Sequence, residues 1–336
     1  MQYHKLKIDS PFSFEAGGLL PGLEIVYHTS PREYREGDRV VWICHALTAD
    51  SDAEDWWPGL VGAGKFFDTQ RDFIVCVNII GSPYGTSGPA TVNPATGKPY
   101  LLDFPKVTVR DIVQSLILVR KALGIKRIDL LTGGSTGGFQ VLEWCVAEPD
   151  VIRKAAILAT DARCTPYLSA FDETMKMALE ADPSFRKAES LKGGEAGLRC
   201  ARAIALISYR SYDGYCLTQQ EPDADTLFPE RAPSYQQYQG EKLVKRFDAY
   251  SYYYLVNTCE SNNLGRGRGG VEAALSTIKA KCQVICIDSD CLFPPKTMKK
   301  IAQAIPGAEY FEIQSAFGHD GFLLENEQLS AIIKNF

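Results

Sequence analysis

The sequence has few histidines and no excess of positive charge. Its 336 residues include only four histidines, and the net charge is −5 at pH 7. Ten cysteines are present, but no Cys-x-x-Cys pair occurs among them, so a zinc site has little basis. An acidic balance gives no support to nucleic-acid binding as the main role. We therefore expect no metal site and no nucleic-acid partner.

Long apolar runs are also absent. No run reaches the length of a membrane span, and the segment from Met1 to Leu6 lacks the apolar core of a signal peptide. These absences favour a cytoplasmic protein without membrane association. In a reducing cytoplasm, cysteines within or beside apolar stretches should behave as small hydrophobes. These cysteines are Cys44, Cys76, Cys145, Cys200, Cys282, Cys286 and Cys291.

Apolar strand patterns alternate with helical patterns along most of the chain. Hydrophobic residues make up 45%, enough for one large domain with an insertion. Two β-rich runs, Tyr3 to Ile8 and Glu24 to His28, predict an antiparallel start, and Val107 to Leu123 predicts a helix. The alternation predicts an α/β fold, with a mostly parallel central sheet flanked by helices. The strand candidates are 39–44, 73–79, 128–132, 155–159, 283–287 and 309–314.

One pentapeptide has the pattern of a nucleophile elbow. Gly133-Gly134-Ser135-Thr136-Gly137 follows the strand candidate 128–132 and precedes a helix-like stretch, 139–144. Such a turn is sharp and strained, so neighbouring positions must lack a Cβ atom. On this motif alone, a glycine- and serine-rich loop is the alternative.

The order of residues along the chain decides in favour of catalysis. Hydrolase-type enzymes with this elbow carry serine, then an acid, then histidine, and only His319 follows Ser135. Asp288 and Asp290 both follow the strand candidate 283–287. We favour Asp290 as the acid, because the proline-containing turn after it could aim its carboxylate inward. We expect Asp288 to be a turn or cap residue.

This order predicts acyl chemistry. His319 would take the proton of Ser135 during attack on an acyl carbonyl, and Asp290 would fix the imidazole tautomer. The backbone N–H groups of Leu47 and Thr136 would form the oxyanion hole. His45 precedes the serine and lies at a strand end, so we expect it to be structural.

The pattern changes between Asp161 and Lys281. Strand signals disappear, and helical periodicity is seen in 174–181, 197–211 and 242–258. We expect a core made of 1–160 and 282–336, with 161–281 inserted as a helical lid. A lid suits acyl transfer, because water must be kept from the acyl-enzyme.

Several segments resemble the homoserine O-acetyltransferase family, and the resemblance covers nearly the whole chain. They are 45–48, 78–89, 93–100, 103–105, the elbow, 238–243, 246–249, 289–290 with 292–294, and 318–320. The resemblance implies an α/β-hydrolase fold and acylation of Ser135 by acetyl-CoA, or succinyl-CoA in some members. The acyl group would pass to the γ-hydroxyl of L-homoserine, in methionine biosynthesis. It also implies acetyl-CoA as co-substrate, no bound cofactor, and a homodimer built through the lid.

The same resemblance implies three contacts to a zwitterionic amino acid. Arg202 matches the arginine that binds the homoserine carboxylate, and Tyr209 matches a tyrosine of the same site. Asp320 matches the aspartate that holds the substrate amine. A guanidinium can grip a carboxylate through two bonds. The alternatives are a solvated helix charge for Arg202, core packing for Tyr209 and a turn for Asp320.

Departures from the family pattern leave the acyl donor and acceptor open. Thr136 stands where the family usually has methionine, and Tyr250 where asparagine is usual. The donor could be acetyl- or succinyl-CoA and the acceptor homoserine or serine, while an esterase would use the same triad with water. Arg266 and Arg268 lie in a Gly-x-Gly-x-x-Gly that follows a polar segment rather than a strand, so we expect a flexible loop there. These arginines could steer the phosphates of CoA.

Overall fold

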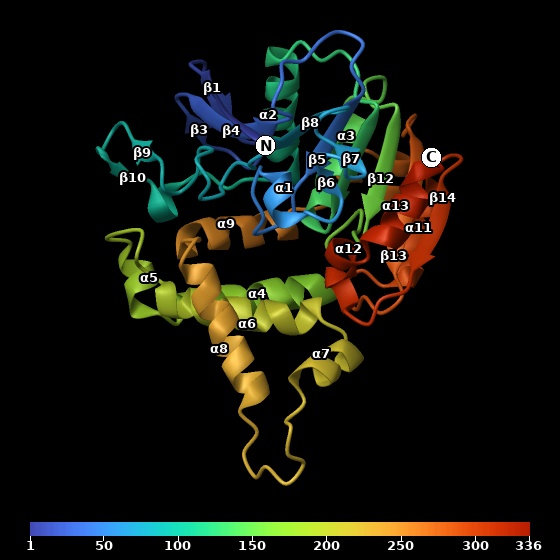
Figure 1. The fold of residues 1–336 in the computed structure, drawn as a ribbon. Helices are drawn as coiled ribbons and strands as arrows, with labels where there is room; N and C mark the ends of the chain where they lie inside the picture. The colour runs from blue at the N-terminus through green and yellow to red at the C-terminus, as the bar shows by residue number, and fades with distance from the viewer.

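A computed structural model describes residues 1–336 and shows one large sheet between layers of helices (Figure 1). The first two pairings, β1–β4 and β4–β8, are antiparallel, and the remaining five are parallel. This topology confirms the predicted α/β class with an antiparallel start. In spatial order the strands are β1 (Gln2–Ile8), β4 (Leu23–Thr29), β8 (Phe73–Val77), β5 (Val40–Cys44), β11 (Leu130–Gly134), β12 (Lys154–Leu158), β13 (Lys281–Ile287) and β14 (Glu309–Ile313).

Three small sheets and several helices accompany the large sheet. Three two-stranded sheets pair β2 (Phe12–Ser13) with β3 (Leu19–Leu20), β6 (Val61–Gly62) with β7 (Phe67–Asp68), and β9 (Val92–Asn93) with β10 (Lys98–Pro99). The helices of the core are α1 (Ala53–Trp56), α2 (Val109–Ala122), α3 (Thr136–Ala147), α10 (Val271–Leu275), α11 (Pro295–Ala304), α12 (Gly321–Leu324) and α13 (Asn326–Lys334), with 3-10 turns at Leu101–Asp103 and Gly318–Asp320.

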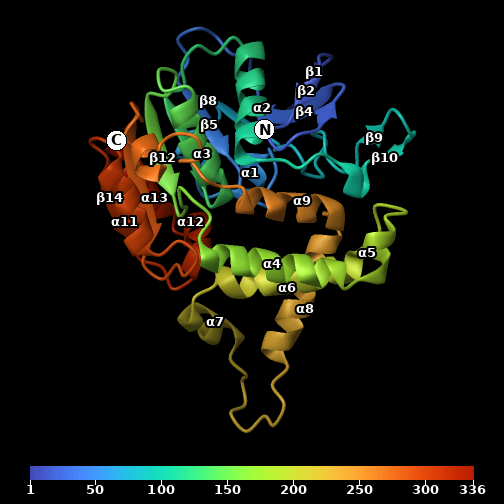
Figure 2. The same ribbon diagram turned by 180° about the vertical axis from the view of Figure 1, so that it is seen from behind.

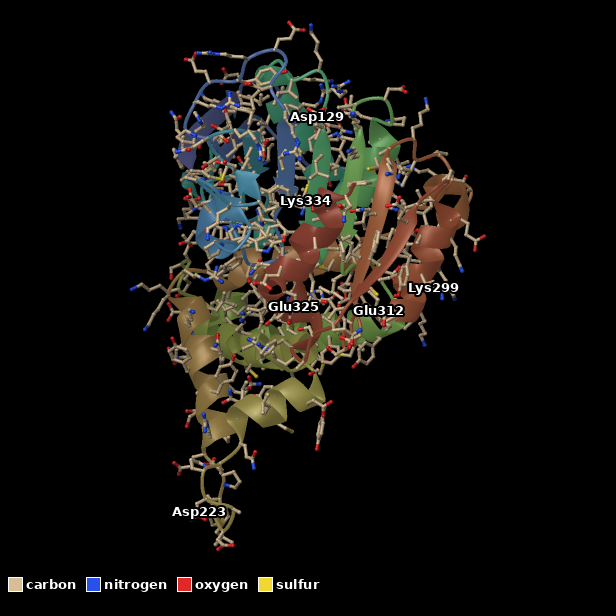
Figure 3. All side chains as sticks on the ribbon, turned by 45° about the vertical axis from the view of Figure 1, so that its right-hand side comes forward. Asp129, Asp223, Lys299, Glu312, Glu325 and Lys334 are labelled. Atoms are coloured by element: carbon tan, nitrogen blue, oxygen red, sulfur yellow. The ribbon has the colours of Figure 1, made fainter.

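Both faces of the central strands β5, β8, β11, β12 and β13 are buried, whereas the edge strands β1 and β14 are partly exposed. Side chains of a strand alternate between faces, so Trp42 of β5 packs in one apolar cluster while Val41 and Ile43 pack in the other. The first cluster includes α2, α3 and α11, and the second includes α12 and α13. Figure 3 shows α13 in front of the sheet, between the labelled residues Glu325 and Lys334. Burial on two faces explains why these strands read as continuous apolar runs.

Residues between β12 and β13 form no strand, only helices and an isolated bridge. Figures 1 and 2 both show α4, α6 and α9 as a layer beneath the sheet, with α7 and α8 projecting further from it. The helices of this layer, called the lid here, are α4 (Pro166–Glu180), α5 (Pro183–Lys187), α6 (Glu195–Tyr209), α7 (Tyr212–Gln219), α8 (Arg231–Val244) and α9 (Ala249–Glu260).

Two helix predictions in the lid were wrong in extent. The predicted helix 242–258 is the end of α8 followed by α9, because Asp248 caps a new helix by accepting the Ser251 N–H at 2.7 Å. The predicted helix 174–181 is only the second half of α4, which starts at Pro166 after the cap Thr165. Capping side chains set these ends, and apolar periodicity does not detect them.

Five of the seven cysteines expected to be buried are buried, namely Cys44, Cys76, Cys145, Cys282 and Cys286. The expectation was wrong for Cys200 and Cys291, which are exposed. Cys200 lies on an outward side of α6, and Cys291 lies in the turn after β13. All ten thiols are free. None of the helices combines the length and apolar character that crossing a membrane requires.

Candidate active site

Ser135 lies in the tight turn between β11 and α3. Its dihedral angles are φ 59° and ψ −126°, a conformation that is strained for a residue with a Cβ atom. The turn also needs close backbone contacts. A Cβ atom on Gly137 would lie 2.2 Å from the Cys44 carbonyl oxygen, and one on Gly133 would lie 2.7 Å from the same atom. The glycines of the motif are therefore required by the geometry that presents Ser135.

Asp290 and His319 form a buried pair. The distance from His319 Nδ1 to Asp290 Oδ2 is 2.7 Å, and the side chains are 4% and 0% exposed. The second oxygen of Asp290 accepts the N–H groups of Leu292 and Phe293, at 2.8 and 3.0 Å. These bonds fix the carboxylate against the ring. They leave His319 Nε2 as the ring nitrogen that can serve a reacting hydroxyl.

Asp288 is placed differently. Its side chain is exposed, and Oδ1 accepts the Ser315 N–H at 2.9 Å. It therefore joins the turn after β13 to the turn after β14. Of the two candidate acids, the structure brings only Asp290 to the histidine.

Opposing effects act on the pKa of His319. Burial, the largest effect, favours the neutral ring, while the charge and hydrogen bond of Asp290 and the charge of Asp320 favour the imidazolium. The net result raises the pKa above its ordinary value. A higher pKa makes the neutral ring a stronger base toward a hydroxyl proton.

The loop after β5 is held by His45. This side chain is fully buried, with Nδ1 2.8 Å from the Ala46 oxygen, while Nε2 accepts the Ile79 N–H at 3.2 Å. One nitrogen donates and the other accepts, so the ring is neutral, and burial lowers its pKa to about 4. The arrangement fits the structural role expected for His45. It positions Leu47, whose N–H forms no hydrogen bond within the chain.

Thr136 is the first residue of α3, so its N–H belongs to the helix turn that has no acceptors of its own. The N–H groups of Leu47 and Thr136 are thus both available near Ser135. A helix N-terminus also favours negative charge. These groups suit an oxyanion that develops on a carbonyl attacked by Ser135.

Six of the eight predicted site residues line one cavity of about 420 Å³ between the core and the lid, and Asp290 and Thr136 are the two that do not. Ser135, His319 and Asp320 line its core side, together with Leu47. Its lid side includes Arg202 and Tyr209 of α6, Lys242 of α8, and Arg246. Residues from segments more than 150 positions apart in the sequence thus share one space.

The residues expected to contact substrate are arranged around His319. The guanidinium carbon of Arg202 lies 5.6 Å from the centroid of the Tyr209 ring, and that ring lies 5.8 Å from the His319 ring. Asp320 forms an ion pair with Arg210, with 3.1 Å between Nε and Oδ2. The pKa of Asp320 is raised, because burial outweighs the nearby positive charges.

Arg266 and Arg268 do not line this cavity. Arg266 pairs with Glu15 at 2.9 Å, and Arg268 grips both oxygens of Glu143 at 2.6 Å. The glycine-rich segment forms turns before α10 and follows no strand. Elsewhere, no group of three or more His, Cys, Asp or Glu side chains is arranged to hold a metal.

Comparisons with known proteins show the fold and the family of the chain. The family model described as alpha/beta hydrolase fold matches residues 39–325. A homoserine O-acetyltransferase of Cyclobacterium marinum is 41% identical over 324 residues, which are 96% of this chain and 92% of that relative. The chain belongs to the homoserine O-acetyltransferase family.

Solved structures show the same fold. The structure titled homoserine O-acetyltransferase from Bacillus anthracis has a TM-score of 0.90 at 24% identity, covering 100% of this chain and 97% of that one. The structure titled esterase E22 also has a TM-score of 0.90, at 20% identity, covering 99% of each chain. Backbone shape therefore does not separate acyl transfer from hydrolysis, and side chains of the cavity must do so.

In this member of the homoserine O-acetyltransferase family, sequence reasoning assigned no role to four residues of the site. Arg210 pairs with Asp320, and Lys242 lines the cavity. Arg246 donates to the Thr48 oxygen at 2.5 Å and to the Tyr84 hydroxyl. Asp172 of α4 is buried near Ser135. Lys242 and Arg246 lie in the segments 238–243 and 246–249 that resemble the family, which is the one signal that could have found them. Nothing in the sequence singles out Arg210 or Asp172, because packing between distant elements decides how their charges are placed.

Proposed function

We propose that this protein transfers an acetyl group from acetyl-CoA to the γ-hydroxyl of L-homoserine through an acetyl-Ser135 intermediate, a step of methionine biosynthesis. The observation that carries the proposal is the shared cavity. Ser135 and His319 line it together with Arg202 and Tyr209, and Asp290 is bonded to His319. The family membership of the chain supports the same donor and acceptor. Acetyl-CoA acts as co-substrate, and no bound cofactor is required.

In the first half-reaction, His319 Nε2 takes the proton of Ser135 as the hydroxyl oxygen attacks the thioester carbonyl carbon. Asp290 stabilises the imidazolium through its bond to Nδ1. The N–H groups of Leu47 and Thr136 bind the negative oxygen of the tetrahedral intermediate. When the carbon–sulfur bond breaks, the imidazolium proton passes to the leaving CoA sulfur.

In the second half-reaction, the γ-hydroxyl of homoserine gives its proton to His319 and attacks the acetyl-serine carbonyl. Collapse breaks the bond to Ser135, which recovers a proton from the imidazolium. Arg202 binds the acceptor carboxylate, and Asp320 binds its ammonium group. Asp320 already pairs with Arg210, so the ammonium group would share this carboxylate.

We further propose a homodimer built through the lid. The hairpin of α7 and α8 extends away from the sheet, and Figure 3 shows Asp223 at its tip. Four apolar side chains on it are more than two-thirds exposed, which is unusual for a monomer surface. They are Tyr212, Leu217, Leu227 and Phe228, at 82%, 72%, 82% and 79%. The double variant Leu227→Asp/Phe228→Asp should convert a dimer to a monomer in sedimentation velocity; a monomeric wild-type protein would contradict the proposal.

The activity test measures CoA release by purified enzyme from acetyl-CoA, with and without L-homoserine, and identifies the product by mass spectrometry. We expect release that depends on homoserine and is lost in Ser135→Ala. Parallel reactions use succinyl-CoA and L-serine. Release that is indifferent to every acceptor would identify an esterase, and transfer by Ser135→Ala would exclude the covalent intermediate.

A further inference from the structure

A second cavity, of about 30 Å³, also borders Ser135. It lies between the elbow and the lid helix α4. Its walls include Ser135, Thr136 and Phe139 from the core, and Asp172 and Met175 from α4. We call it the inner cavity. No Lys, Arg or His side chain lines it.

Asp172 is an unusual residue to line such a cavity, because its carboxyl group is buried and unpaired. It is only 2% exposed, its Oδ2 atom is buried without a partner, and no hydrogen bond reaches its carboxyl group. Burial raises its pKa well above the ordinary value, and the nearby charge of Glu260 raises it further. Lys176 lies one turn along α4, but its ammonium group is held by Glu173 and Glu260, both at 2.8 Å.

An unpaired buried carboxyl group costs stability. The charge of Lys176 acts against the rise in the pKa of Asp172, but burial outweighs it. The hydroxyl of Thr136, in the wall of the same cavity, is also buried without a partner. Two unsatisfied polar groups beside a nucleophile indicate a space shaped for the reacting group rather than for packing.

We propose that the inner cavity is the acyl pocket and that Asp172 limits it to a two-carbon acyl group. This inference rests on the proposed acylation of Ser135. When the carbonyl oxygen points to the Leu47 and Thr136 N–H groups, the rest of the acyl group must point to another wall beside Ser135. The inner cavity provides that space.

The volume of the pocket favours acetyl. A water-sized group needs about 10–15 Å³ of such space, so a cavity of about 30 Å³ accepts the methyl group of an acetyl-serine. A succinyl group carries two methylenes and a carboxylate in place of that methyl. It cannot enter unless the wall at Asp172 moves.

Charge favours the same choice. A succinyl carboxylate in this pocket would be buried beside Asp172 with no cation to pair with it. A buried charge without a partner is strongly unfavourable, and two carboxyl groups in contact cannot both ionise. Asp172 therefore excludes acidic acyl groups by its volume and by its chemistry.

The test uses p-nitrophenyl acetate, propionate and butyrate, which acylate Ser135 without CoA or homoserine. For the wild-type enzyme we expect kcat/KM to fall about tenfold or more for each added methylene. Asp172→Ala should raise the butyrate-to-acetate ratio at least about tenfold. Asp172→Asn, with nearly the same volume, should keep the wild-type ratio.

Controls separate this role from damage to the fold. Met177→Ala lies on the same helix with 61% exposure and should leave the ester profile unchanged. Asp172→Ala should melt no lower than wild type, because it removes an unpaired carboxyl group. If it fails to fold, Met175→Ala enlarges the same cavity and should widen the profile in its place.

The outcomes are distinct from those of the proposed function. A wild-type enzyme that accepts butyrate as readily as acetate would overturn the acyl-pocket assignment, as would an unchanged ratio in both Asp172→Ala and Met175→Ala. CoA release from succinyl-CoA should rise in Asp172→Ala relative to acetyl-CoA. If the enzyme shows the expected ester profile but does not transfer acetyl to homoserine, the assignment of the acyl pocket is supported and only the proposed acceptor is contradicted.

Discussion

The catalytic carboxyl group of the core and two charged groups of the lid differ in how their hydrogen-bonding capacity is used. On the core side, Asp290 has three hydrogen bonds, and His45 uses both ring nitrogens. On the lid side, Asp172 has none, and Arg202 stacks on Tyr209 without any hydrogen bond or ion pair. Groups that perform chemistry are fixed beforehand, whereas groups that select substrates keep bonding capacity for the ligand.

The largest effect should come from breaking the core side at Asp290. In Asp290→Asn the amide oxygen can still accept the Leu292 and Phe293 N–H groups, so the fold should persist. The histidine then loses its carboxylate and its correct tautomer, and kcat should fall about 10³–10⁴-fold. Steady-state CoA release measures this loss. Asp288→Asn is the matched control, and equal losses in the two variants would contradict the assignment.

The second-largest effect is expected from a substitution in the nucleophile elbow. In Gly137→Ala the new methyl group would lie 2.2 Å from the Cys44 oxygen, so β5 and α3 must separate. Overpacking of this kind costs about 3 kcal/mol, and the geometry of Ser135 should be lost with it. Urea unfolding and fluorophosphonate labelling of Ser135 report the two effects. A variant with wild-type stability and labelling would show that the turn tolerates a Cβ atom.

On the lid side, removing Arg202 should affect the acceptor and spare acylation. Arg202→Met loses a charge-assisted contact worth about 1.5–3 kcal/mol, so the KM for homoserine should rise about 10- to 100-fold. For Arg202→Lys we expect a KM for homoserine between those of the wild type and Arg202→Met, because lysine keeps the charge and lacks the planar guanidinium. Hydrolysis of p-nitrophenyl acetate, which needs no amino acid, serves as the reference reaction. A parallel loss in both reactions would place Arg202 in the chemistry instead.

The smallest effect is expected from Asp320, which lies beside His319 and pairs with Arg210. Burial lowers the pKa of His319, whereas Asp290 and then Asp320 raise it. The ring must be neutral to accept a proton, so activity should rise with pH through this pKa. Asp320→Asn removes one raising charge, and the acidic limb of kcat/KM for p-nitrophenyl acetate should move to lower pH. An unmoved limb would mean that the charge of Asp320 is not felt at His319.

Much of the fold could be predicted because its signals are local. Six strands of the large sheet, β5, β8, β11, β12, β13 and β14, were placed within a few residues. All of them except the edge strand β14 are buried on both faces, so they read as continuous apolar runs. The short strands β6, β7, β9 and β10 were not predicted. The break between α8 and α9 was missed, because an apolar periodicity continues through it while the Asp248 cap starts a new helix. The exposure of Cys200 was missed because a small thiol fits either face of α6.

The candidate site shows the same division. Chain order pointed to Ser135, Asp290 and His319, and the geometry of the site fits their predicted roles. Asp290 was preferred over Asp288 because a proline-containing turn follows it. In the structure Asp290 contacts His319, whereas Asp288 accepts the Ser315 N–H. The ion pair between Arg210 and Asp320 joins residues 110 positions apart, and no sequence pattern predicts it.

The sequence by itself determined the order of serine, acid and histidine, the α/β alternation and the glycines of the elbow, because backbone conformation and strand burial are written in short segments. Only the tertiary structure decided which carboxyl groups are paired. Asp290 meets a ring 29 residues away, and Asp172 is left without a partner because Lys176 is held by Glu173 and Glu260. Such partners depend on how distant elements pack, and packing is a property of the whole fold.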